Sequence, residues 1–222
     1  MQEFDKLTDD HIFPLSWYPD TTPENISKWK APVCSTCNGD FGRIEEELRL
    51  RIAHCLGIMD SGAHGIVEKA MRSLKPGYGR SPDDSRRRLR KWEKIKKEIM
   101  PAQKVPTAAI LPGFGLKWDQ DLLKTLAIEI PRDLLERFAE KIVKGLTHVF
   151  CGHCIPSNYR IIVRLDSLGE FEDLLIKYGK HEARGPGIEV IYVKVADDTY
   201  AMAYKIVIWG KLVFYSYVLP TQ

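Results

Sequence analysis

This chain of 222 residues has no long apolar run and no large net charge. No segment approaches the roughly 20 consecutive apolar residues that a membrane-spanning helix needs, so we expect no membrane association. The net charge is only +3, so an anionic partner would have to be met by local basic patches rather than by the whole chain. The first ten residues are acidic and polar, which is unlike a secretory signal.

Cysteine is scarce and odd in number, with five residues that include two C-x-x-C pairs. Such a set does not form a disulfide framework, and it suits a reducing compartment in which thiols stay reduced or bind metal. We therefore expect a cytoplasmic protein. The apolar fraction of 44% is ordinary for a globular chain, and the length allows more than one folding unit.

The hydrophobic pattern predicts an α+β protein in three segments, 1–57, 58–103 and 104–222. Helical periodicity and end signals predict helices over 38–55, 63–74, 82–100, 131–149 and 168–178. Alternating or β-branched runs predict strands over 5–14, 159–165, 188–196, 200–209 and 211–218. Residues 15–33 are expected to form a loop. The last two strands flank Gly210-Lys211, which predicts an antiparallel hairpin.

The stretch from Asp10 to Asn38 contains polar residues that can act as a general base or as metal ligands. Hydrolysis of a phosphodiester requires a base to deprotonate water and a divalent cation held by oxygen ligands. His11 suits the base, because an unperturbed imidazole titrates at about pH 6.5. Asp10 and Asn38 offer the oxygen atoms that Mg²⁺ prefers. Neighbours on a strand point to opposite faces, so Asp10 and His11 can share one site only if the strand is bent or lies at an edge.

The order of these residues resembles that of the HNH endonuclease family. The matching positions are Asp10-His11-Ile12-x-Pro14, Asn25 and Cys34-x-x-Cys37-Asn38, within a stretch covering about residues 8–46. The run from Cys37 to Glu45 is similar to a subgroup with a "CN…fG..iE" ending. The resemblance implies an N-terminal ββα-metal module in segment 1–57. It also implies that His11 is the general base, that Asp10 and Asn38 hold a Mg²⁺-type ion, and that Asn25 braces the loop and orients the base.

Two departures from the family pattern concern metal binding. The helix lacks the family's last histidine, so Asn38 would have to carry that role, with Asp40 as a less favoured substitute. Many relatives bind Zn²⁺ with two C-x-x-C pairs, whereas only Cys34 and Cys37 occur near this motif, and two thiolates do not complete a tetrahedral site. Three explanations stay open: a second pair upstream in a longer chain, loss of the zinc site, or completion by Cys151 and Cys154.

A basic run lies in the helix predicted over 82–100. Eight of its side chains are Lys or Arg against one acidic residue between positions 86 and 97. Such a run is often a solvated helix face, but Lys and Arg contacts to phosphates also supply most non-specific DNA affinity. We expect DNA contacts from Arg86, Arg87, Arg88, Arg90, Lys91 and Lys94.

Together these patterns predict an endonuclease that cleaves DNA, with double-stranded DNA as the expected partner. One such site cuts one strand, so a monomer is expected to nick and a homodimer to make double-strand breaks. Two other functions stay open: a catalytically inactive nucleic-acid-binding protein on the same scaffold, and a zinc-bound protein-interaction module. The role of segment 104–222 is not predicted.

Overall fold

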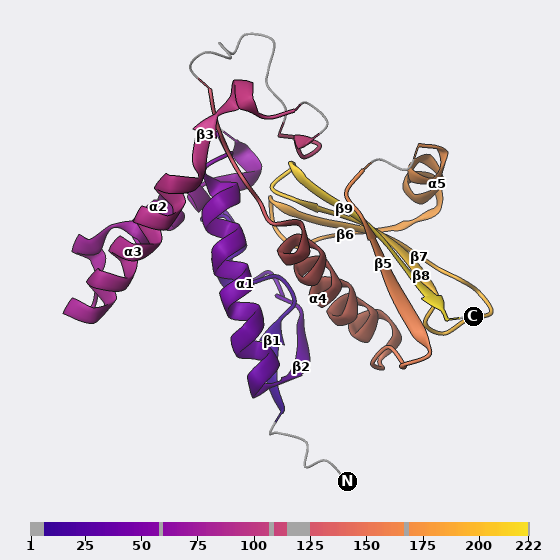
Figure 1. Ribbon diagram of the computed structural model, residues 1–222. Helices are drawn as coiled ribbons and strands as arrows, with labels where there is room; N and C mark the ends of the chain where they lie inside the picture. Colours follow the sequence, from indigo (N-terminus) through magenta and orange to yellow (C-terminus); the bar gives the residue numbers. More distant parts are fainter. Residues whose placement is uncertain (1–6, 58–59, 107–108, 115–124, 167–168, 222) are drawn as a thin grey trace.

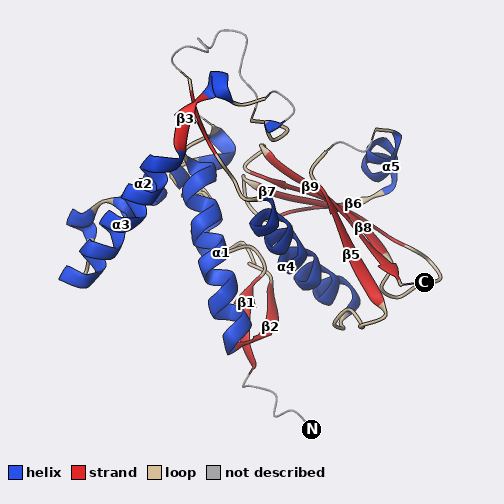
Figure 2. Cartoon of the chain, viewed as in Figure 1, coloured by secondary structure: helices blue, strands red, loops and turns tan. Residues whose placement is uncertain are grey.

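The computed structural model describes residues 7–57, 60–106, 109–114, 125–166 and 169–221. Within these residues the chain is α+β, with an N-terminal hairpin, five α-helices and a C-terminal five-stranded antiparallel sheet. Helix α4 lies between the long N-terminal helix α1 and this sheet, and helices α2 and α3 extend away from them (Figure 1). Figure 2 shows that the strands fall into two main groups, one beside α1 and one beside α4.

The N-terminal unit is a two-stranded hairpin followed directly by a helix. Strand β1 (Leu7–His11) pairs antiparallel with β2 (Lys30–Cys34), with His11 opposite Lys30. Helix α1 (Ser35–Ala53) begins at once after β2. Cys34 caps it, because the Cys34 Sγ accepts a hydrogen bond from the Cys37 backbone N–H at 3.3 Å. In this unit the sequence pattern missed strand β2, which it placed in a loop.

The middle of the chain is helical. Helix α2 (Ile66–Leu74) packs on α1 and on helix α3 (Pro82–Glu98), and ion pairs join α3 to α1. Ser81 caps α3 by accepting the Asp84 backbone N–H at 3.2 Å, and Pro82 occupies the first turn, as the sequence predicts. Strands β3 (Ile99–Pro101) and β4 (Leu126–Ile128) then form a short antiparallel pair.

Helix α4 (Arg132–Cys151) is the central packing element. It ends at Gly152, whose φ of 78° is a left-handed conformation that glycine adopts without strain. Its Gly145 lies against the hairpin, since a Cβ there would come within 2.7 Å of Ile12 Cγ1. This close approach requires glycine and brings α4 against the end of β1.

The C-terminal sheet has the strand order β5-β9-β8-β7-β6, with every neighbouring pair antiparallel. Its strands are β5 (Tyr159–Arg164), β6 (Lys180–Ala183), β7 (Ile188–Lys194), β8 (Met202–Ile208) and β9 (Leu212–Pro220). Alternate β8 residues are buried, and Tyr204 on that face bonds Thr147 of α4. Helix α5 (Glu170–Tyr178) covers part of the other face, where Glu172 pairs with Lys205.

The hydrophobic core is shared by all three segments of the chain. Trp17, which follows β1, stacks on Trp209 with ring centroids 4.7 Å apart, and it contacts Phe138 of α4 in a tilted arrangement with centroids 4.4 Å apart. The indole N–H of Trp209 also donates to the Trp17 carbonyl at 2.7 Å. The turn of the last hairpin comprises Trp209, with a φ of 57°, Gly210 and Lys211, so it contains the predicted Gly210-Lys211 and one further residue. These contacts hold the N-terminal hairpin and the C-terminal sheet in one body with α4.

Candidate active site

Asp10 and His11, the acid–histidine pair of the predicted site, form the last two residues of β1. Asp10 lies opposite Ala31 and His11 opposite Lys30 in the hairpin. Side chains alternate between the faces of a strand, and here only Asp10 of the two lines the cleft beside α4. The pair therefore stands at the end of a strand, where the next residue, Ile12, already enters the core.

Asp10 is held by a lysine from the far half of the sequence. The Lys141 Nζ lies 2.7 Å from Asp10 Oδ2 and donates a hydrogen bond to the His11 carbonyl at 2.8 Å. The same ammonium is ion-paired with Glu45 of α1. The Lys141 side chain is only 8% exposed, so this is a largely desolvated contact between α4, β1 and α1. Neither Lys141 nor Glu45 was predicted as a site residue.

A cleft of about 460 Å³ opens beside this contact. One wall is formed by the hairpin and the first turns of α1, including Val33 and Phe41, and the other by α4 and the segment that leads into β5. Asp10 and Lys141 line it, and Lys144 and His148 add basic groups from α4. A cleft of this size, with apolar walls and a few polar groups, is typical of a ligand site.

His11 has a half-buried imidazole with basic neighbours. Burial lowers the pKa of His11 below its ordinary value, and Lys30 lowers it further, while the carboxylate of Asp10 acts in the opposite direction. A lowered pKa keeps the imidazole neutral at neutral pH, which is the state that accepts a proton.

Asn38 and Asn25 occupy different surroundings. Asn38 lies in the first turn of α1, and its Nδ2 donates to Thr8 Oγ1 at 3.4 Å. Thr8 is on the same face of β1 as Asp10, about 7 Å along the strand. Asn25 lies exposed in a turn in which the Ile26 N–H donates to the Pro23 carbonyl. Among the described residues no hydrogen bond or ion pair joins the side chains of Asp10, His11, Asn25 and Asn38, so their predicted roles stay predictions.

The four cysteines considered for zinc lie in two separate pairs. Cys34 and Cys37 are adjacent at the start of α1. Cys151, at the end of α4, donates instead to the Thr199 carbonyl at 3.1 Å, and Cys154 lines the cleft. No group of three or more His, Cys, Asp or Glu side chains within the described residues is placed to hold a metal ion. The structure therefore does not bring the two pairs together.

The chemistry of Asp10 and Asn38 nevertheless fits a hard divalent cation. The Asn38 amide bonds Thr8 through its nitrogen, so its oxygen is not used in that bond. Asp10 Oδ2 is buried, and it is ion-paired with the Lys141 ammonium at 2.7 Å. An acidic oxygen in this state is suited to a cation, and Lys141 is a competing positive charge.

The basic helix α3 uses most of its predicted DNA-contact residues within the protein. Lys91 pairs with Glu46 at 2.6 Å and Lys94 with Glu47 at 2.8 Å, which joins α3 to the acidic face of α1. Arg88 pairs with Asp84 at 3.0 Å, and Arg86 pairs with Asp83. Arg87 and Arg90 are exposed, and no ion pair of either occurs within the described part of the chain. The sequence did not show that α1 supplies the complementary acidic row.

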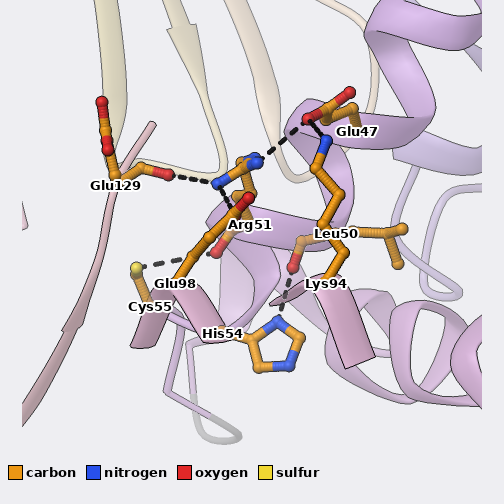
Figure 3. Close-up of polar contacts among 8 residues, drawn as sticks. All are labelled: Glu47, Leu50, Arg51, His54, Cys55, Lys94, Glu98 and Glu129. Carbon is orange, nitrogen blue, oxygen red and sulfur yellow. Dashed lines mark hydrogen bonds and ion pairs between the residues drawn. The ribbon is translucent and has the colours of Figure 1, made fainter. Parts of the chain in front are cut away.

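A second buried cation, Arg51 of α1, lies near α3 (Figure 3). Its guanidinium is paired with Glu47 at 3.0 Å and with Glu98 at 2.6 Å, and it donates to the Glu129 carbonyl at 2.6 Å. The Arg51 side chain is 4% exposed. This cluster ties α1 to α3 and to the residue that follows β4.

Comparisons with known protein families, with curated proteins and with solved structures each find no match. The fold defines an α+β protein, and its hairpin–helix unit carries the candidate site. Across the described residues, no helix is both long and apolar enough to cross a membrane.

Proposed function

We propose that this protein is an HNH-type endonuclease that hydrolyses DNA phosphodiester bonds, with His11 as general base and one divalent metal ion as cofactor. The observation that carries the proposal is the hairpin–helix unit, in which β1 ends in Asp10-His11 and α1 begins with Asn38 in its first turn. This β-β-α order is the one that the sequence resemblance implies. The 1–57 segment would then be the nuclease module, with α3 and the C-terminal sheet supporting it.

The residues divide the work as follows. His11, at the end of β1, accepts a proton from the attacking water. Asp10 and Asn38 would hold the cation, which supplies charge stabilisation for the phosphate and the leaving oxygen when it is bound. The scissile strand would lie across the end of β1, where His11 is, and Lys144 and His148, which line the adjacent cleft, would contact flanking phosphates.

A plasmid-nicking assay with Mg²⁺ tests this function. The wild type should convert supercoiled plasmid to the nicked form, and EDTA should stop it. The H11A variant should lose about 100-fold or more in rate, because a positioned general base contributes on that scale. The matched control is H181A, which removes an exposed histidine of β6 far along the chain and should leave the rate unchanged. An inert wild type, or an H11A variant as active as wild type, contradicts the proposal.

A second candidate is a catalytically inactive nucleic-acid-binding protein on the same scaffold. The ion pair between Lys141 and Asp10 favours it, because a neutralised carboxylate is a poorer ligand for a metal ion. In that case the wild type binds labelled duplex DNA in a salt-dependent manner and never nicks it, with or without Mg²⁺.

A further inference from the structure

The ammonium of Lys141 is enclosed by oxygen atoms from two other elements. Its partners are the carboxylates of Asp10 and Glu45 and the backbone carbonyl of His11. We call these three groups together the oxygen cage. The carboxylate side chains are 19% and 13% exposed, so both acids are largely removed from water. The cage draws β1, α1 and α4 together at one point.

Lysine does not balance the charge of the cage. Two ionised carboxylates carry two negative charges and one ammonium carries a single positive charge, so one negative charge is left over in a poorly solvated place. Two carboxylates and a backbone carbonyl are also the donor set of a hard divalent cation, which takes its other ligands from water. A divalent ion would therefore balance the cage better than the lysine does.

The Lys141 ammonium can also leave the oxygen cage, because the cage adjoins the cleft. Asp10 and Lys141 both line the 460 Å³ cleft, so the lysine can leave and an ion can enter from the same side. An ammonium is a compact point charge on a flexible stem, and it makes no planar, two-pronged contact that would lock it in place. These properties separate Lys141 from an arginine in a comparable position.

We propose that Asp10, Glu45 and the His11 carbonyl form a divalent-cation site that the ammonium of Lys141 occupies in the resting protein. The inference rests on the proposed function only in taking Asp10 as a cation ligand, and it gives Glu45 and the His11 carbonyl the place that the proposed function gives to Asn38. Glu45 becomes the second carboxylate ligand, and Lys141 becomes the resident cation that a metal ion must displace. Metal affinity of the wild type is then weakened by the lysine.

Thermal unfolding of the K141M variant, with Mn²⁺ as the only probe, tests the site. Without metal, K141M should melt at a lower temperature than the wild type, because two buried carboxylates are left facing each other. Mn²⁺ should restore its melting temperature and should bind about 10- to 100-fold more tightly to K141M than to the wild type. A variant that folds only in Mn²⁺ gives the same support. A melting temperature that responds to Mn²⁺ no more than the wild type does, or a variant that stays unfolded in Mn²⁺, overturns the proposal.

Two control variants separate the cage from a general effect of lost charge. R132M removes an exposed arginine of the same helix, which does not line the cleft, and should leave the Mn²⁺ response at the wild-type level. The double variant E45Q/K141M keeps the side-chain shapes but removes one carboxylate, so the gain in Mn²⁺ affinity should disappear. An E45Q/K141M protein that binds Mn²⁺ as tightly as K141M contradicts the assignment of Glu45. These measurements need no DNA, so an inactive nuclease would not change their outcome.

Discussion

Lys141 and Arg51 each form a cluster with the same kinds of partner group, but the two clusters lie in different surroundings. Each is a buried cation that contacts two carboxylates and one backbone carbonyl. Arg51 pairs with Glu47 one turn away on its own helix, whereas both carboxylates of the Lys141 cluster come from other elements. Lys141 lines the large cleft beside the predicted catalytic pair, and Arg51 joins α1 to α3 and the β4 region.

The difference shows that a buried ion pair has no fixed meaning. A guanidinium offers donors in a planar fork, and the Arg51 fork is divided among three acceptors in different directions, so a spherical ion cannot replace it. An ammonium is close to a point charge, and its oxygen partners would suit a metal ion equally well. We therefore assign Arg51 to stability and Lys141 to the candidate site.

The R51M variant should destabilise the protein most and tests whether the Arg51 cluster serves stability alone. It should lower the free energy of unfolding by about 3–5 kcal/mol, because removing the buried cation takes the Arg51 ion pair from Glu98 and leaves Glu47 paired with Lys94 alone. Chemical denaturation measures the loss. Mn²⁺ should not restore it, in contrast to K141M. The control is R43M on the same helix, whose side chain is 81% exposed and whose removal should cost less than about 1 kcal/mol. Full recovery of R51M in Mn²⁺ would make the two clusters equivalent.

The pH dependence of stability should sharpen the contrast between the two helix α1 glutamates. Burial alone would raise the pKa of Glu47, but hydrogen bonds from Lys94 and Arg51 outweigh it and lower the pKa below 4.5. The stability that Glu47 contributes is therefore present above pH 4.5 and is lost as the pH falls through its lowered pKa. The E47Q variant should lose less stability than the wild type on acidification.

Glu45 should act in the opposite direction. Burial raises its pKa above 4.5, and the attraction of Lys141 only partly offsets this. Its ionisation in the folded state therefore costs stability as the pH rises from 4.5 through its raised pKa, and E45Q should remove that cost. Thermal melts of E47Q and E45Q between acidic and neutral pH measure both slopes. Parallel changes in the two variants would contradict the assignment.

The smallest expected effect concerns the basic residues of α3, where paired and exposed cations can again be compared. R87A/R90A should weaken binding to duplex DNA and reduce the salt dependence of log K by about two units, because two phosphate contacts are lost. K91A/K94A removes cations already paired with Glu46 and Glu47, so its salt dependence should stay near the wild type. Fluorescence anisotropy at several salt concentrations measures the slopes. Equal slopes for the two double variants would show that internal pairing does not decide DNA contact.

Much of the fold could be predicted, because helix periodicity and caps are local. The predicted helix over 82–100 agrees with α3 (Pro82–Glu98), and its Ser81 cap is formed. Strand β2 was missed because Pro32 interrupts the pattern, yet Pro32 is tolerated in this two-stranded hairpin, where one side of each strand needs no partner. Strand β6 (Lys180–Ala183) was missed because it is short and polar, so its extended conformation depends on pairing with β7 and not on a local sequence pattern.

The candidate site could be predicted only in part. The positions of Asp10 and His11 on a strand and of Asn38 at the start of a helix follow from local sequence. The partner of Asp10 does not follow from local sequence. Lys141 lies 131 positions further along the chain (141 − 10), and it reaches Asp10 only through the packing of α4 on the hairpin. Lys141 reads as an ordinary polar position of an amphipathic helix. The burial of a cation depends on tertiary contacts that a sequence pattern does not contain.

The most direct test of the central claim is anomalous diffraction at the manganese edge from K141M crystals grown with Mn²⁺. The proposal predicts one strong anomalous peak for a Mn²⁺ ion that is coordinated by the carboxylates of Asp10 and Glu45. The ion should lie beside the His11 carbonyl, at the position of the Lys141 ammonium in the wild type. No peak at this position, or a peak bonded to Asp10 that leaves Glu45 without metal contact, would contradict the account.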